Sequence, residues 1–243
     1  MQRNKIVIPV IILILFCVCL MFAGGLGLGF GVSDIFEAAI SNQSVIPAVE
    51  TAAHEPPERP AQQGRLLLAD DFSQERWKVH SDSEHRKGYA DGQYFIAVDA
   101  QEYSYWSLAG ENYQDFVLEV ETIHLDGPEN NDYGVVLRHQ DDANFYSFEI
   151  SSDGYYTFTK LVGDELFDII PWQRSRAIRQ NSSRNMLRVE AIGPNFTFYI
   201  NDELIDAAID SDLDQGDIGL VAGTYQDPGI RIAFDNLKVW AVE

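Results

Sequence analysis

The sequence predicts an all-β domain, a two-sheet antiparallel jelly-roll sandwich, preceded by one transmembrane helix and a disordered stalk. Three observations lead to this prediction. From Leu66 onward, apolar and polar residues alternate with a period of two, which is typical of strands with one buried face. Turn-forming Asp, Asn, Gly and Pro residues separate these runs at regular intervals. Ahead of them, a long uncharged run is followed by a polar stretch that contains several prolines.

The first element is the run Ile6–Val32, which has no charged residue and follows Arg3 and Lys5. About 20 apolar residues are enough for a helix to cross a bilayer, and basic residues before it favour a cytoplasmic N-terminus. We therefore predict a single-pass plasma membrane protein in which residues 1–32 form a cytoplasmic tip and the membrane helix, with the C-terminal domain outside. The alternative is a signal peptide cleaved near Ala23, although the apolar part of such peptides is usually about 7–15 residues long.

The second element, residues 33–65, is predicted to be an extended stalk or linker. It contains Ile46-Pro47 and the proline-rich run His54–Pro60, with few apolar residues between them. Such a composition cannot bury enough apolar surface to fold, and its prolines keep the backbone extended.

The third element, residues 66–243, is predicted to be the sandwich domain. The run Phe116–His124 shows the alternation, with Phe116 and Leu118 on one face and Glu119 and Glu121 on the other. Short runs of this kind with no convincing helix are typical of a two-sheet sandwich. Further strands are predicted at 66–69, 94–98, 103–108, 133–139, 145–151, 155–162, 186–192, 196–201, 218–222 and 230–240.

The composition excludes one class of partner. The chain has 17 Lys and Arg against 38 Asp and Glu, a net charge of −21. A surface this acidic repels phosphate backbones, so nucleic acid is not an expected partner. Both cysteines, Cys17 and Cys19, lie in the apolar run, so the predicted outer domain has no disulfide.

Several motifs of the domain occur in a recognisable order. They are Asp70–Ser73, Tyr133–Arg138, Asn144–Phe148, Asn185–Glu190, Gly216–Leu220 and Phe234–Trp240. In this order they resemble the concanavalin A-like jelly-roll domains of bacterial surface proteins, which include laminin-G-like modules and 3-keto-disaccharide hydrolase-like domains. The resemblance covers Leu66–Val242. It implies the jelly-roll fold, binding of a glycan or a protein, in some members glycoside cleavage, and often a structural calcium ion.

The implied calcium ion would be held by aspartates at the two ends of the domain. Calcium takes six to eight oxygen ligands, often carboxylates. Asp70 or Asp71 and Asp235 would meet if the first and last strands pair, as they do in related sandwiches. The alternative is that these aspartates cap turns or face water.

No catalytic residue is assigned. Glycosidases of this architecture resemble one another in a strand that carries alternating carboxylates. The nearest match here is Glu119-Val120-Glu121, followed by Ile123 where a third carboxylate would be expected. An enzyme is therefore less expected than a binding protein.

A second group of potential metal ligands lies in the segment His80–His85. It contains two histidines, an aspartate and a glutamate within six residues. Zinc sites usually have more ordered ligand spacing, so this segment is interpreted as a polar loop.

Aromatic residues give the best predicted binding surface. The chain has 4 Trp, 11 Tyr and 14 Phe, more than a sandwich core is expected to absorb. Sugar rings stack on Tyr and Trp while polar side chains bind the hydroxyl groups. The predicted ligand-binding residues are Tyr133, Arg138, Tyr146, Tyr156, Lys160 and Trp172. Trp172, expected in a loop, is the best of them, and the alternative is that half of the set belongs to the core.

The sequence thus predicts a membrane-anchored extracytoplasmic module that binds a glycan or a surface protein. Two alternatives stay open. One is a sugar-active hydrolase of the same fold, and the other is an ectodomain with a purely structural role.

Overall fold

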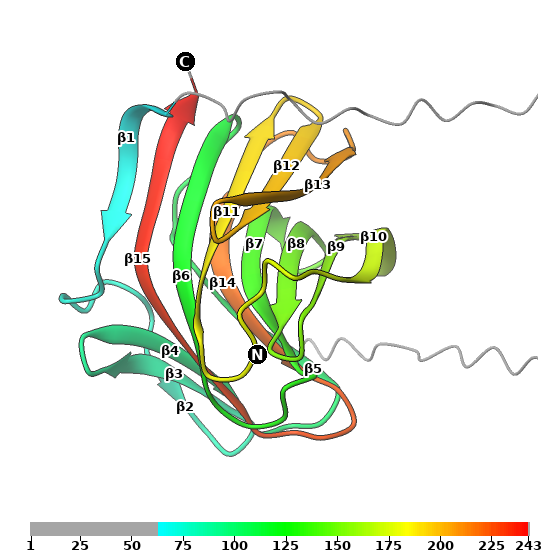
Figure 1. Ribbon diagram of the computed structural model, residues 1–243. Helices are drawn as coiled ribbons and strands as arrows, with labels where there is room; N and C mark the ends of the chain where they lie inside the picture. Colours follow the sequence, from blue (N-terminus) through cyan, green and yellow to red (C-terminus); the bar gives the residue numbers. More distant parts are fainter. Residues whose placement is uncertain (1–62, 243) are drawn as a thin grey trace, which may run out of the picture. The chain divides into compact units, whose positions relative to one another are not determined.

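The computed structural model describes residues 63–242, which form two antiparallel β-sheets packed face to face (Figure 1). The predicted membrane segment, Ile6–Val32, and residues 33–62 of the predicted stalk lie outside the described residues. Within residues 63–242 there is no helix that could cross a membrane. The predicted all-β, two-sheet sandwich is confirmed for this part of the chain.

The larger sheet has nine strands in the order β13-β12-β11-β6-β15-β4-β3-β2, with β1 also paired to β15. Its strands are β1 (Gln63–Asp70), β2 (His80–Ser81), β3 (His85–Ala90), β4 (Gln93–Val98), β6 (Phe116–Asp126), β11 (Arg184–Ile192), β12 (Asn195–Ile200), β13 (Glu203–Ile209) and β15 (Ile230–Val242).

The strand β15 organises this sheet because it is long enough, at 13 residues, to pair with three others. Along one edge it pairs with β6. Along the other edge, Ile230–Phe234 pair with β4 and the part from Leu237 to Val242 pairs with β1. The expectation that the first and last strands of the domain pair is therefore confirmed.

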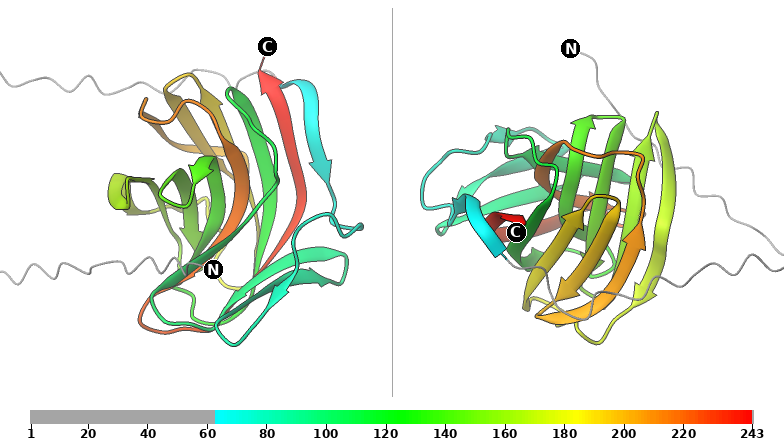
Figure 2. Two further views of the ribbon diagram at one scale, coloured as in Figure 1. Left: turned by 180° about the vertical axis from the view of Figure 1, so that it is seen from behind. Right: turned by 90° about the horizontal axis from the view of Figure 1, so that it is seen from above.

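The smaller sheet has six strands in the order β10-β9-β8-β7-β14-β5. This sheet bows toward the larger one, so its outer face is concave (Figure 2). Its strands are β5 (Tyr103–Leu108), β7 (Asp132–Asp141), β8 (Asn144–Ser151), β9 (Tyr155–Val162), β10 (Glu165–Arg174) and β14 (Asp217–Thr224).

Aromatic rings from the two sheets meet in the core. The ring of Phe148 in β8 stacks on Phe198 in β12, with the ring centroids 4.6 Å apart. Phe158 in β9 lies 4.9 Å from Phe196 and 4.6 Å from Phe198. All four side chains are completely buried. Because successive side chains of a strand point to opposite faces, this packing fixes which residues of β8 and β9 face outward.

Several short strands were not predicted. The edge strands β2 and β10, together with β3 and β13, have weak or interrupted alternation. In β10 the alternation is broken at Pro171 and Trp172, where the register with β9 shifts. Proline and irregular register are typical of edge strands. Trp172, expected in a loop, therefore lies in β10.

Arg138, near the end of β7, is a cation completely enclosed by the sandwich. Its Nη1 donates to the Leu213 carbonyl at 3.0 Å, and its Nη2 donates to the carbonyls of Gly193 and Gln114 at 2.7 and 3.1 Å. The guanidinium also lies over the ring of Phe196, 4.9 Å from its centroid. This side chain therefore ties three separate connections of the chain together, and its role in ligand binding stays a prediction.

Replacing Arg138 with alanine should lower the free energy of unfolding by about 3–5 kcal/mol, because a completely buried side chain is lost and three carbonyls lose their donor. Urea denaturation of the full-length protein measures this. The control is Arg86→Ala, which removes an exposed ion pair with Asp99 and should cost less than about 1 kcal/mol. Equal losses in the two variants would contradict the structural role of Arg138.

Candidate functional site

Two carboxyl groups lie on neighbouring strands of the concave face. Asp132 begins β7, and Glu149 in β8 is paired with Gly134, two residues further along β7. Residues two positions apart on a strand point to the same face. Asp132 and Glu149 are therefore diagonal neighbours on that face of the sheet. Tyr133 and Phe148, adjacent to them in sequence, are completely buried in the core. The core packing thus places Asp132 and Glu149 on the outer face.

Glycine makes room for one of these carboxyl groups. A Cβ atom at Gly223 in β14 would lie 2.1 Å from Oδ1 of Asp132 and 2.8 Å from Oγ of Ser104. Asp132 is only 5% exposed, and its Oδ1 has no hydrogen-bond partner among the described residues. A buried acceptor without a partner is uncommon in native proteins.

Both carboxyl groups have raised pKa values. Burial is the largest cause that raises the pKa of Asp132 and of Glu149. The pKa of Glu149 lies well above its ordinary value because the charge of Asp132 adds to the effect of burial. A hydrogen bond between the two lowers the pKa of Asp132 and raises that of Glu149. The pKa values of both carboxyl groups are therefore raised, that of Glu149 more strongly.

Tyr225, which follows β14, lies beside the carboxyl pair. Its backbone N–H donates to Oδ1 of Asn131 at 3.0 Å, which fixes the turn after β14. Burial raises the pKa of the Tyr225 phenol far above its ordinary value, and the charges of Asp132 and Glu149 and a hydrogen bond to Asp132 raise it further. The phenol is therefore neutral and can donate a hydrogen bond.

Trp172 completes the site from the edge strand β10. Its side chain is 39% exposed and interacts with the Tyr225 phenol, whose pKa it lowers. The backbone before it is held by Thr157 in β9, whose Oγ1 donates to the Ile170 carbonyl at 2.8 Å. The site thus combines a carboxyl pair whose pKa values are raised with one phenol and one exposed indole. This arrangement can accept hydrogen bonds from hydroxyl groups while aromatic faces pack against C–H groups.

Of the predicted ligand-binding residues, only Trp172 belongs to this site. The three predicted tyrosines face the inside of the sandwich, with exposures of 0% for Tyr133 and Tyr146 and 5% for Tyr156. Their hydroxyls bond within the chain, that of Tyr146 to Asp210 at 2.6 Å and that of Tyr156 to Asp206 at 3.0 Å. The structure therefore places them, with Arg138, in the core rather than on an open face. They are buried because their rings pack in the core that the two sheets form together.

Lys160 is also engaged within the chain. Its Nζ lies 2.5 Å from Oδ2 of Asp210 and 2.6 Å from Oδ2 of Asp212. These ion pairs connect β9 to the segment before β14, so the lysine holds a connection in place.

The residues predicted to hold calcium each bond to nearby groups. Asp70 accepts hydrogen bonds from the Phe72 backbone at 2.8 Å and the Trp77 indole at 3.2 Å. Asp71 accepts from Ser73, as an aspartate that caps a turn does. Asp235 lies on another side, where its Oδ2 is 3.5 Å from Nη1 of Arg184 and 3.4 Å from the Gln93 amide. The three carboxyl groups do not converge on one point, and a calcium site at these residues stays a prediction.

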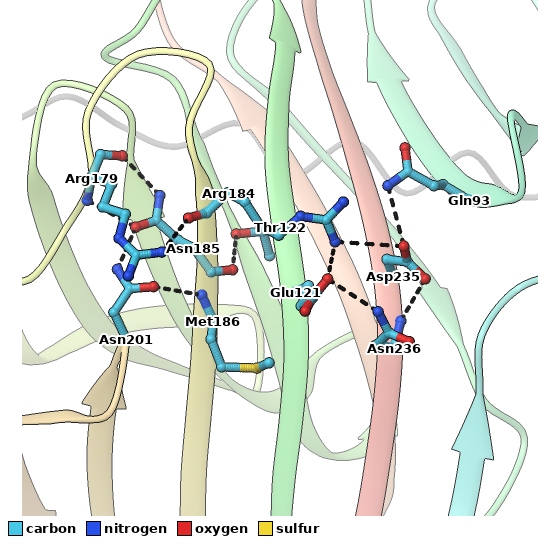
Figure 3. A network of polar contacts seen from close by, with 10 residues as sticks. All are labelled: Gln93, Glu121, Thr122, Arg179, Arg184, Asn185, Met186, Asn201, Asp235 and Asn236. Atoms are coloured by element: carbon cyan, nitrogen blue, oxygen red, sulfur yellow. Dashed lines mark hydrogen bonds and ion pairs between the residues drawn. The ribbon is translucent and has the colours of Figure 1, made fainter.

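In the nearest match to a glycosidase motif, Glu119-Val120-Glu121, the two glutamates lie on the outer face of the larger sheet and Val120 lies in the core. Glu121 pairs with Arg184 and accepts a hydrogen bond from Asn236, as Figure 3 shows. Glu119 pairs with Arg188 at 2.7 Å. Both carboxylates are paired with arginine, whereas no arginine or lysine ion pair joins Asp132 or Glu149 among the described residues.

The residues that sequence reasoning missed are Asp132, Glu149 and Tyr225. Asp132 and Glu149 occupy the outward positions of their strands, where a carboxylate is usually just solvated. Two glycines inside strands, Gly134 and Gly223, could have indicated the site in the sequence. A glycine inside a strand often marks a place where another group approaches the backbone closely.

Residues 65–240 match the family model described as the 3-keto-alpha-glucoside-1,2-lyase-like domain. No curated protein matches the chain. Solved structures with a similar fold include three bacterial proteins at low identity. A Bacillus subtilis protein of unknown function with a galectin-like fold has a TM-score of 0.54 at 12% identity, covering 74% of this chain and 98% of its own.

The catalytic domain of an endo-1,3-beta-glucanase (laminarinase) from Thermotoga petrophila RKU-1 has a TM-score of 0.54 at 9% identity, covering 76% of this chain and all of its own. The carbohydrate binding module CBM66 from Bacillus subtilis has a TM-score of 0.49 at 21% identity, covering 75% of this chain and all of its own. The first two similarities support the sandwich fold. Since the family model spans most of the chain, this protein belongs to the 3-keto-alpha-glucoside-1,2-lyase-like domain family.

Proposed function

We propose that this protein binds a glycan on the concave face of its six-stranded sheet. The observation that carries the proposal is the carboxyl pair of the buried Asp132 and the half-buried Glu149, beside Tyr225 and the exposed indole of Trp172. Binding sites for small molecules typically combine aromatic faces with a few polar groups that fix orientation.

The charge of the site favours a neutral polyol over other ligands. An anionic ligand would be repelled by Asp132 and by the net charge of −21. A sugar offers hydroxyl groups that the half-buried Glu149 can bind, and its C–H faces fit the exposed indole of Trp172. Membership in a family named for a glucoside-cleaving activity points to the same class of ligand.

The predicted anchor, Ile6–Val32, would hold such a site at the outer surface of a membrane. A tether raises the local concentration of a binding module near its ligand, so a weak site can be effective there. A surface protein stays the alternative ligand, and a purely structural ectodomain is the third possibility.

Replacing Trp172 with alanine should weaken glycan binding roughly 10-fold, because one stacked aromatic ring contributes about 1 kcal/mol or more. A glycan array with the full-length protein identifies the ligand, and calorimetry measures the affinity. The control is Trp240→Ala, which removes a partly exposed indole from β15 in the other sheet. A protein that binds no glycan but crosslinks to a protein partner would contradict the proposal and favour the surface-protein alternative.

The second candidate function is elimination on a 3-keto-α-glucoside, favoured by the raised pKa values of Asp132 and Glu149 and by the family description. A ketone at C3 acidifies the proton on C2. The ionised Asp132 would remove that proton, the C2–H electrons would form the C1=C2 bond, and the C1–O bond would break. Glu149 would give its proton to the departing oxygen, so charge and protons balance across the pair.

If the protein is a lyase, release of the aglycone from a 3-keto-α-glucoside should fall at least about 100-fold in Asp132→Asn, because general bases typically contribute at least that factor. Ultraviolet absorbance of the enone product measures the reaction. The exposed Glu203 supplies the control Glu203→Gln, which should keep full activity. If wild-type protein binds 3-keto-α-glucosides without releasing the aglycone, the binding function stands and the lyase function does not.

The raised pKa of Glu149 also predicts a pH dependence of stability. The folded protein keeps this proton at a pH where the unfolded chain has lost it, so wild-type stability falls as pH rises above the unfolded pKa of about 4. For each such group, the free energy of unfolding falls by up to about 1.4 kcal/mol per pH unit until the pH reaches the pKa of the group in the folded protein. Glu149→Gln removes this term.

The stability of Glu149→Gln relative to wild type should therefore increase from pH 4 to pH 8, as measured by urea denaturation. Glu203→Gln should follow the wild type at every pH. A constant difference between Glu149→Gln and wild type would show that Glu149 ionises normally in the folded protein.

A further inference from the structure

Two histidines and an aspartate meet at the turn between β2 and β3. One ligand atom each of His80, Asp82 and His85 lies within 4.8 Å of the other two. Among residues 63–242 no other three His, Cys, Asp or Glu side chains come together in this way. His80 lies in β2 and His85 begins β3, so pairing of the two strands brings the imidazoles to the same place.

The turn itself orients the carboxylate. Oδ1 of Asp82 accepts the backbone N–H groups of Glu84 at 2.8 Å and of His85 at 2.9 Å. Oδ2 of the same side chain lies 3.0 Å from Nε2 of His80. One oxygen therefore fixes the turn, and the other faces the histidine.

A buried, unpartnered nitrogen of His85 is a second observation that points to a bound metal ion. It is 8% exposed, and its Nδ1 makes no hydrogen bond, with Oδ1 of Asp82 at 3.5 Å. Its ring packs 3.6 Å from the ring of Tyr105 in the other sheet and stacks on His80 at 4.5 Å. The ring is thus held in place while one buried nitrogen lacks a partner, which native proteins rarely leave unexplained.

We propose that His80, Asp82 and His85 form a zinc site. Zinc takes imidazole nitrogen at about 2.0–2.1 Å and carboxylate oxygen at about 2.0–2.2 Å, usually as four tetrahedral ligands. Ligand atoms around such an ion lie about 3.3 Å apart, so only small side-chain movements are needed here. Water fills the fourth position, because His80 and Asp82 are exposed. Calcium and magnesium prefer oxygen ligands and fit this nitrogen-rich group poorly.

The chain contains a matched comparison for this site. His139 and Asp142 also form a histidine–aspartate pair three residues apart, with Nε2 of His139 at 3.5 Å from the carboxylate and buried without a hydrogen bond. That pair has no second histidine or carboxylate close enough to complete a three-ligand group. It therefore tests whether a buried histidine beside an aspartate is sufficient for zinc binding.

The experiment is zinc titration of the full-length protein, prepared without a polyhistidine tag and treated with EDTA, by calorimetry and by competition with a chelating dye. We expect one zinc ion per chain and a higher midpoint of thermal unfolding with zinc, because a ligand that binds the folded state stabilises it. Calcium should not raise the midpoint through this site. Cobalt should give the visible absorption typical of a tetrahedral site.

Three variants decide the assignment. His80→Gln alters an exposed side chain, and Asp82→Asn retains an oxygen that can accept the two backbone N–H groups, so both should fold. Each should weaken zinc binding more than 10-fold, since even changes to groups behind the ligands cost about 10–100-fold. His139→Gln should bind zinc like the wild type.

Unchanged binding in His80→Gln would overturn the proposal. Binding that disappears only when Cys17 and Cys19 are replaced by serine would also overturn it, since those thiols, the two cysteines of the chain, are potential zinc ligands as well.

Discussion

The contact between the inner faces of the two sheets is the constraint on which the rest of this structure depends. Rings of β8 and β9 pack against rings of β12, and all of them are completely buried. A shift of one residue in any of these strands would turn its aromatic side chains toward solvent. The outward residues are therefore fixed by the inward ones. Glu149 reaches the concave face because Phe148 and Ile150 must reach the core.

The same constraint explains how far sequence reasoning could go. Alternation predicted β6, β8, β9 and β11 because each has one buried face. It could not tell which face of the smaller sheet is open, because Tyr133, Tyr146 and Tyr156 have hydroxyl groups that suit either environment. Their buried hydroxyls find partners such as Asp210, far away in sequence. Such partners follow from tertiary structure and not from local pattern.

Residues at the sites were predicted unevenly for a related reason. Trp172 was found because a large aromatic residue beside proline and polar residues stands out in any sequence. Asp132 and Glu149 look like ordinary solvent-facing acids, and only the strand pairing shows that they share one place. His80, Asp82 and His85 were visible as a motif, but a loop has no fixed geometry until β2 and β3 pair.

The position of β15 in the larger sheet has a consequence for how the domain acquires its structure. This strand is the last of the described residues, yet it lies between β6 and β4 and also pairs with β1. During synthesis, β4 and β6 are made long before the strand that joins them, and their edges stay unpaired in the meantime. Contacts such as Gln63 with Val242 span nearly the whole domain, and such distant pairings are slow to form. The domain is therefore expected to fold late and as one unit. Its risk of aggregation is greatest before β15 pairs, while the strand edges are still exposed.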